Sequence, residues 1–288
     1  MKASELILNP DGSVYHLGLK PGDCAPLIIT VGDPNRVSTV ARHFDTVTFF
    51  HQTREIHTQT GMLSGRPISV ISTGMGTDNI DIVFNELDAL FNMDLQTGSP
   101  LPAHTQLTFI RLGTSGAAQS EIPLDNIMVA ETAIGFDNLL HYYDLPTHPM
   151  AKALTAYLSL PASFSHPYGV DADPMLVSAC EDLGFENGVI ATNSGFYGPQ
   201  LRQLRIPSKK AYSLNQLTEF TYHNQSITHF DMESSGIYGL SQLMGHKAIS
   251  VSAILANRSL GSFSLDPSAT VDKMIRKVLD GIAAGKFD

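Results

Sequence analysis

The sequence predicts a single α/β domain, because strand-like and helix-like segments alternate along all 288 residues. Short apolar runs typical of buried strands recur between stretches whose apolar residues repeat at helical spacing. The sequence contains no internal repeat, linker or low-complexity tract that would divide it. We therefore expect residues 1–288 to form one domain around a continuous core.

The composition narrows the classes of function. With 43% hydrophobic and 16% charged residues, the chain has the composition of a core-forming protein rather than a disordered one. A formal net charge of −10 argues against nucleic acid and anionic membranes as partners. No apolar run would span a bilayer, and residues 1–12 lack a secretory apolar segment. Cys24 and Cys180 make neither a disulfide framework nor a metal-binding spacing, so we expect a cytoplasmic protein that holds no metal.

In the first half of the chain, apolar spacing and turn residues define the expected elements. Residues 26–31 (PLIITV) form a strand-like run, and Asp33 and Pro34 then suit the N-cap and the first position of a helix. Residues 46–50 are a weaker strand candidate, and residues 67–73 (PISVIST) form another buried run. The same criteria predict a helix over residues 78–91, a loop over residues 92–106 and a strand over residues 107–110.

The second half of the chain continues the alternation. Apolar runs predict strands over residues 126–134, 188–194 and 247–255. Residues 135–165 are harder to interpret, because histidine, tyrosine and proline interrupt any period. Helices are expected over residues 174–183, after residues 232–235 up to residue 244, and from about residue 266 onward.

Residues 107–119 (LTFIRLGTSGAAQ) are the most informative stretch. Arg111 directly follows a buried apolar run, where a charge is costly unless it meets a partner. Gly113 and Gly116 then predict a turn whose backbone N–H groups can approach a ligand closely. The arginine, hydroxyls and glycines together suit an oxyanion clamp, while a structural ion pair that caps the strand accounts for the same residues.

Two further segments have the residue types of a binding site. Residues 32–36 (GDPNR) join a strand to a helix whose N-terminus favours anions, and Arg36 can add a full charge. An ordinary capped turn with a solvated arginine explains them as well. In residues 195–202 (GFYGPQLR), an aromatic ring can stack on a flat ligand while Gln200 and Arg202 reach its edge. A loop with one packed aromatic residue is the simpler explanation of that segment taken alone.

Five separated segments together resemble the nucleoside phosphorylase family, and within it the uridine phosphorylases. Each segment is weak alone, but their occurrence in one order argues against chance. The resemblance extends from residue 14 to residue 258 and implies the family's fold, a central twisted mixed β-sheet flanked by helices. The segments are residues 32–36 (GDPNR), 53–56 (TREI), 111–119 (RLGTSGAAQ), 195–202 (GFYGPQLR) and 230–235 (FDMESS).

The resemblance implies how phosphate and a nucleoside would be held. Glu233 would bind the ribose 2′- and 3′-hydroxyls, and Gln200 and Arg202 would recognise the O2, N3 and O4 edge of a pyrimidine. From a neighbouring subunit, Arg54 would reach the phosphate and His16 the ribose 5′-hydroxyl. The other implied residues are Gly32, Arg36, Arg111 and Thr114 for phosphate, Met232 against the ribose, Phe196 on the sugar and base, and Arg258 beyond the base. The implied catalytic residues are Arg111, Glu233, Gln200 and Arg202.

The implied reaction converts uridine, or deoxyuridine, and phosphate reversibly into uracil and (deoxy)ribose 1-phosphate. Phosphate held against the anomeric carbon is the nucleophile, so neither a covalent intermediate nor a general base is needed. No cofactor is expected, since phosphate is a co-substrate. Active sites shared between subunits imply a homodimer or a larger oligomer such as a hexamer. Some relatives bind potassium between subunits near the residue matching Glu55, but Asn79 stands here where a serine is expected, which counts against that ion.

Three alternatives remain open. A purine nucleoside phosphorylase would carry a Ser-Asp pair after the last strand, but residues 256–259 (ANRS) contain no aspartate. A nucleosidase, which uses water, would not need the arginines Arg36, Arg54 and Arg111. A nucleoside-binding protein without activity could share the fold, but the loss of a phosphate arginine or of Glu233 would then be expected.

Overall fold

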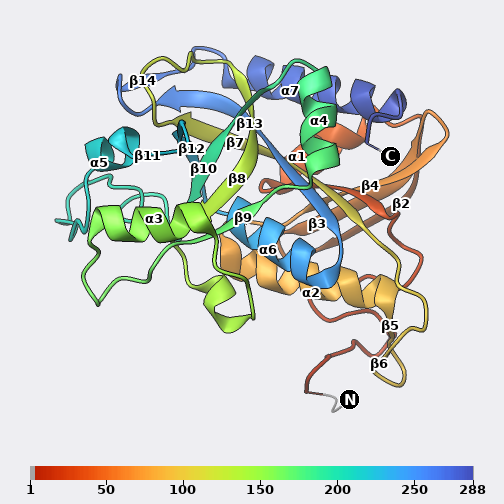
Figure 1. The fold of residues 1–288 in the computed structure, drawn as a ribbon. Helices are drawn as coiled ribbons and strands as arrows, with labels where there is room; N and C mark the ends of the chain where they lie inside the picture. Colours follow the sequence, from red (N-terminus) through yellow and green to blue (C-terminus); the bar gives the residue numbers. More distant parts are fainter. Residues whose placement is uncertain (1–3, 288) are drawn as a thin grey trace.

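The computed structural model describes residues 4–287 and is built around one twelve-stranded mixed sheet (Figure 1). Its strands are β1 (Leu27–Val31), β2 (Thr46–Thr53), β3 (Ile56–Leu63), β4 (Arg66–Ser72), β7 (Thr108–Ala117), β8 (Ile127–Gly135), β9 (Tyr168–Asp171), β10 (Glu186–Thr192), β11 (Thr221–Tyr222), β12 (Gln225–Asp231), β13 (Lys247–Asn257) and β14 (Ser262–Phe263). A separate small sheet pairs β5 (Met93–Asp94) with β6 (Ser99–Pro100). The order in the main sheet is β11-β12-β10-β8-β13-β7-β1-β4-β3-β2, while β14 pairs with β13 and β9 pairs with β8.

A second pairing of β12 closes part of this sheet. Besides its parallel neighbour β10, β12 pairs antiparallel with β7, so that His229 lies opposite Ala117 and Phe230 opposite Gly116. Strands β7, β13, β8, β10 and β12 therefore form a closed five-stranded barrel. This closure sets the segment that follows β12 beside the second half of β7.

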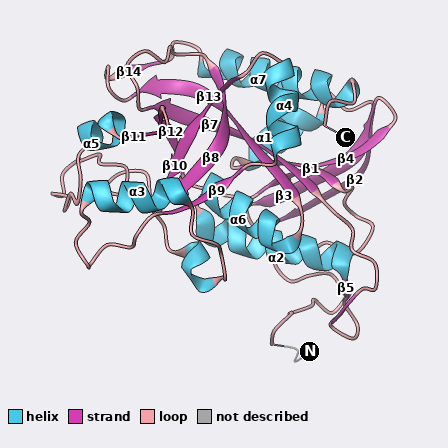
Figure 2. Cartoon of the chain, viewed as in Figure 1, coloured by secondary structure: helices cyan, strands magenta, loops and turns pink. Residues whose placement is uncertain are grey.

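Helices cover both faces of the sheet (Figures 1 and 2). They are α1 (Pro34–Ala41), α2 (Thr77–Asn92), α3 (Pro149–Leu158), α4 (Pro174–Asp182), α5 (Leu214–Glu219), α6 (Ser234–Met244) and α7 (Pro267–Ala283), with a 3-10 turn η1 (Leu139–Tyr142). On one face α2 packs on α6, which contacts β8 and β13; on the other face α4 and α7 cover β13, and α1 packs on β3 and β4. The rings of Phe84 on α2 and Phe109 on β7 are fully buried with centroids 4.3 Å apart, which joins this helix layer to the sheet.

This architecture confirms the expected fold class, an α/β domain with a central mixed sheet between helices. The strands expected over residues 26–31, 67–73 and 126–134 are β1, β4 and β8, each within one residue at both ends. The start of α1 is also as predicted, because Asp33 Oδ1 accepts a hydrogen bond from the Asn35 N–H at 2.9 Å and Pro34 opens the helix.

Some expectations about local structure are wrong. The turn expected at Gly113 and Gly116 is part of β7, which continues to Ala117. The loop expected over residues 92–106 contains the short β5–β6 hairpin. Strands β3 and β9 and helix α3 lie where the sequence pattern assigns no element. β3 is defined by antiparallel neighbours on both sides, β2 and β4, rather than by an apolar run of its own.

Among residues 4–287, no helix combines the length and the apolar character needed to cross a membrane. Cys24 and Cys180 are both buried free thiols. Burial raises the pKa of each thiol to about 12, so both are unreactive parts of the core.

Candidate active site

A cavity of about 860 Å³ lies beside the second half of β7, where β1, β4 and β12 end, and most of the predicted site residues line it. Nine of the twelve predicted residues line it: Gly32, Arg36, Arg111, Thr114, Phe196, Gln200, Arg202, Met232 and Glu233. They come from four separate segments of the chain, so the tertiary structure brings together residues that lie far apart in the sequence. His16, Arg54 and Arg258 do not line this cavity.

Arg111 projects from the middle of β7 and is almost completely buried. Its Nη2 lies 2.5 Å from Glu233 Oε2 and 3.4 Å from Asp231 Oδ2. Burial alone lowers the pKa of Arg111, but the two carboxylates outweigh burial and raise the pKa above its usual value. A Cβ atom at position 113 would lie 1.8 Å from Arg111 Nη1, so Gly113 is required for the close approach of this guanidinium rather than for a turn.

Arg36 on α1 stands beside Arg111. Its Nη1 donates a hydrogen bond to the carbonyl oxygen of Leu112 at 3.2 Å. Burial lowers the pKa of Arg36, and the positive charge of Arg111 lowers it further. A buried guanidinium group (Arg111) and a half-buried one (Arg36) that repel one another at a cavity favour the binding of an anion between them.

The segment after β12 supplies the carboxylates. Glu233 accepts hydrogen bonds from Arg111 and from the backbone N–H of Gly76 at 2.8 Å. Asp231 accepts from Thr192 Oγ1 at 2.7 Å and from Ser234 Oγ at 2.6 Å, which anchors it at the start of α6. Neither Asp231 nor Gly76 is among the residues predicted for the site. Gly76 belongs to a glycine-rich segment that follows the strand predicted over residues 67–73, and that position could have indicated it.

At the other end of the cavity, Gln200 and Arg202 bind each other. Arg202 Nη1 donates to Gln200 Oε1 at 2.5 Å and to the Phe196 carbonyl at 2.7 Å, and Arg202 Cζ lies 3.7 Å from the centroid of the Phe196 ring. Gln200 Nε2 donates to the Asp231 carbonyl at 3.2 Å. Burial, and then the charge of Arg258, lower the pKa of Arg202 to about 10. Arg258 lies behind this pair and donates from Nη2 to the Gln200 carbonyl at 3.0 Å.

His16 and Arg54 both contact Tyr15 and do not line the cavity of their own chain. His16 Nδ1 is 2.5 Å from Glu86 Oε1, and the His16 ring meets the Tyr15 ring edge-on with centroids 4.9 Å apart. Arg54 occupies the β2–β3 turn with φ +50°, and its Cζ lies 5.5 Å from the Tyr15 centroid. Their predicted role concerns a neighbouring subunit and stays a prediction.

Asp88, His104 and His246 are the candidate metal ligands among the described residues, since their ligand atoms lie within 4.8 Å of one another. However, His246 Nδ1 accepts a hydrogen bond from the Leu107 N–H at 3.2 Å. The ring proton therefore resides on Nε2, which donates to Asp88 Oδ1 at 3.0 Å. A metal ion could bind His246 Nε2 only if this proton left. We therefore interpret the cluster as a hydrogen-bonded pair, His246 and Asp88, beside the surface residue His104.

The chain is similar to known proteins both in sequence and in structure. A sequence model described as the phosphorylase superfamily matches residues 26–279 of the chain. A uridine phosphorylase from Thermococcus kodakarensis is 29% identical over 255 residues, which cover 88% of this chain and 80% of that protein. A uridine phosphorylase from Haemophilus influenzae is 26% identical over 250 residues, which cover 85% of this chain and 87% of that protein. A crystal structure of a Trypanosoma brucei nucleoside phosphorylase that shows uridine phosphorylase activity is similar with a TM-score of 0.86 and 28% identity, covering 97% of this chain and 99% of that one.

Proposed function

The chain belongs to the phosphorylase superfamily, and from that premise we propose that it is a uridine phosphorylase. This pentosyltransferase converts uridine and phosphate reversibly into uracil and ribose 1-phosphate. The observation that carries the proposal is one cavity lined by the arginine pair Arg36 and Arg111 and by the Gln200 and Arg202 pair. The first pair suits an anion, and the second suits the polar edge of a base.

Phosphate is the nucleophile in this proposal. Arg36 and Arg111 bind its oxygens, with Thr114 and the backbone at Gly32 as further hydrogen-bond donors. Arg111 is already held by Glu233 and Asp231, so it needs little reorganisation when phosphate arrives. Holding phosphate against the anomeric carbon removes the entropic cost of bringing two reactants together, which is worth several kcal/mol.

Charge separates as the glycosidic bond breaks. Positive charge develops on the ribose, where phosphate and Glu233 stabilise it. Negative charge develops on uracil, where Arg202 and Gln200 stabilise it by hydrogen bonding. The hydrogen bond between Arg202 and Gln200 must be exchanged for bonds to the uracil edge when the nucleoside binds. Phe196 stands half exposed at the rim, where its ring can cover sugar and base.

The proposal includes a homodimer or larger oligomer in the cytoplasm. Arg54 and His16 both contact Tyr15, and neither lines the cavity of its own chain, which supports a shared role in the cavity of a neighbouring subunit. Two buried free thiols support a reducing compartment. We propose that phosphate is the co-substrate and that no cofactor or metal takes part; Glu55 and Asn79 line the cavity and would be the residues to vary if potassium affected the rate.

Uracil release from uridine, followed with and without phosphate, tests the proposal. We expect release only when phosphate is present, and little or no base release from inosine. Release at the same rate without phosphate would identify a nucleosidase, and preference for inosine would identify a purine enzyme. The Glu233→Gln variant, which keeps the shape of the side chain but not its charge, is the matched inactive control.

A further inference from the structure

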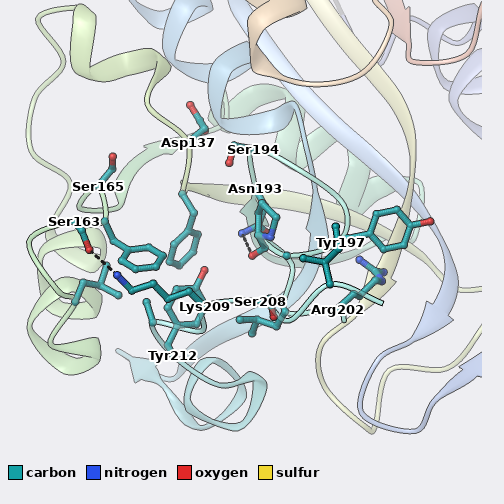
Figure 3. Close-up of a pocket in the computed structure, with 18 of the residues that line it drawn as sticks. Asp137, Ser163, Ser165, Asn193, Ser194, Tyr197, Arg202, Ser208, Lys209 and Tyr212 are labelled. Carbon is teal, nitrogen blue, oxygen red and sulfur yellow. Dashed lines mark hydrogen bonds between the residues drawn. The ribbon is translucent and has the colours of Figure 1, made fainter. Parts of the chain in front are cut away.

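A second cavity, of about 840 Å³, is lined in part by the loop that carries Gln200 and Arg202, and Figure 3 shows Tyr197 and Arg202 of this loop in its lining. Among residues 4–287, Arg202 alone lines both cavities. The loop forms the wall between them: Phe196 and Gln200 line the nucleoside cavity, while Tyr197 and Pro199 line the second one. A ligand in the second cavity would therefore contact the residues that hold the base-binding side chains in place.

The charged lining of the second cavity is mainly cationic. Arg202, Arg205 and Lys209 line it, although the chain as a whole carries a net charge of −10. Asp137 is the acidic residue in the lining, and its carboxylate already accepts hydrogen bonds from the hydroxyls of Tyr168 and Ser235. The uncompensated charge is thus positive, and it favours an anion.

Two buried polar atoms of this lining have no hydrogen-bond partner. Asn193 is 1% exposed, and its Nδ2 donates to the Pro199 carbonyl at 3.2 Å, which leaves Oδ1 without a partner. The Ser208 hydroxyl oxygen is also buried without a partner. In Figure 3 Asn193 lies between Lys209 and Arg202. Since buried polar atoms normally have partners, this pair indicates a ligand that offers a donor to Asn193.

Aromatic rings supply flat apolar surface in the same cavity. The rings of Phe136 and Tyr212 lie with centroids 5.3 Å apart. Lys209 extends over the Phe164 ring, with Nζ 5.6 Å from its centroid and 3.4 Å from Ser163 Oγ (Figure 3). Flat rings beside cationic side chains fit a molecule with a planar body and an anionic group.

We propose that the second cavity binds an organic anion with a planar ring, of the chemistry of a nucleoside monophosphate, and that this anion inhibits the enzyme. The ring packs on the aromatic residues and donates a hydrogen bond to Asn193, while the anionic group binds Lys209 and Arg205. Arg202 turns toward the anion and leaves Gln200 and the Phe196 carbonyl. The inhibitory part rests on the proposed function, because it requires Arg202 to bind the base; the binding part does not.

Isothermal titration with uridine 5′-monophosphate tests the binding part. We expect saturable binding that Lys209→Glu weakens by about tenfold, as expected for reversing one partly screened charge. The matched control is Lys210→Glu, which makes the same change of net charge at the neighbouring exposed position outside the cavity. We expect less than a twofold effect there. Glu233→Ala, which alters only the nucleoside cavity, should leave binding unchanged.

Two results would overturn the proposal. Binding that is lost in Glu233→Ala but kept in Lys209→Glu would place the nucleotide in the nucleoside cavity. The absence of any binding at millimolar concentration would show that the second cavity takes no such anion. In the turnover assay, uridine 5′-monophosphate should raise the KM for uridine in the wild type and in Lys210→Glu, and do so less in Lys209→Glu. If the protein binds the nucleotide with this pattern but does not cleave uridine, the proposed function fails while the second site stands.

Discussion

Arg111 Nη2 lies 2.5 Å from Glu233 Oε2, and both side chains are 8% exposed. The two residues are 122 positions apart in the chain and belong to segments that the β12–β7 pairing brings side by side. In the proposed mechanism one binds phosphate and the other binds ribose. Their contact therefore fixes the two substrates relative to each other before either arrives.

Removing the arginine should destabilise the protein as well as inactivate it. Arg111→Ala leaves the carboxylates of Glu233 and Asp231 buried without their cation, which typically costs about 3–5 kcal/mol. We expect that loss in the free energy of unfolding measured with urea, at unchanged m-value.

Arg42→Ala is the matched control for this measurement. Arg42 pairs with Asp272 at 2.9 Å on the surface, where both partners are more than one third exposed. Solvent screens such a pair, and its loss should cost less than about 1 kcal/mol. Equal effects of the two substitutions would show that the buried pair is not a structural element of the site.

Replacing the base-binding residues should change the kinetic constants for uridine much more than those for phosphate. Gln200→Ala and Arg202→Ala remove groups proposed to stabilise the departing uracil, so we expect kcat/KM for uridine to fall by about 100-fold or more. The KM for phosphate should change by no more than about twofold. Steady-state kinetics with each substrate varied in turn measures both. Arg205→Ala, in the same loop but outside the nucleoside cavity, is the control; unchanged kinetics in both test variants would remove these residues from the site.

Shared active sites predict complementation between inactive variants. Each proposed site uses Glu233 of one chain and Arg54 of its neighbour. In a mixed dimer of one Arg54→Ala chain and one Glu233→Ala chain, one of the two sites therefore has both wild-type residues and the other has neither. After denaturation and refolding together, a random mixture should recover about one quarter of the wild-type activity. Refolding each variant alone is the control and should recover none. No recovery in a mixture that forms dimers would assign Arg54 to its own chain.

His229 should make stability fall in mild acid. Burial, with a smaller effect from the charge of Arg111, lowers its pKa from 6.5 to about 4, and its Nε2 has no partner. Below pH 6.5 this histidine binds a proton in the unfolded state, whereas in the folded state it stays neutral down to about pH 4. Stability is therefore full above pH 6.5 and declines toward pH 4, by up to about 3 kcal/mol from this residue.

Urea unfolding at several pH values tests this expectation. His229→Leu should show a shallower decline between pH 6.5 and pH 4 than the wild type, whatever its stability at neutral pH. His223→Gln, at an exposed turn, should keep the wild-type slope. If the stability of His229→Leu fell with decreasing pH as steeply as that of the wild type, groups other than His229 would be responsible for the acid sensitivity.

Much of the fold is predictable because its signals are local. The caps of α1, the apolar runs of β1, β4 and β8, and the alternation of strands and helices are encoded within a few neighbouring residues. β3 and β9 escape prediction because their environment is set by distant partners, β2 and β4 for β3, and β8 for β9. For the same reason, Gly113 is misjudged as a turn residue when its role is to make room for the Arg111 side chain.

Local patterns along the chain are enough to predict the fold class, the residue types available for an anion and a base, and the resemblance that implies their roles. The packing of distant segments places Arg36, Arg111, Gln200 and Glu233 around one cavity, leaves His16 and Arg54 outside its lining, and sets Arg202 between two cavities. Sequence patterns report on neighbours along the chain, whereas the site depends on the closure of the barrel through the antiparallel pairing of β12 with β7. That pairing joins residues more than a hundred positions apart, and no local spacing encodes it.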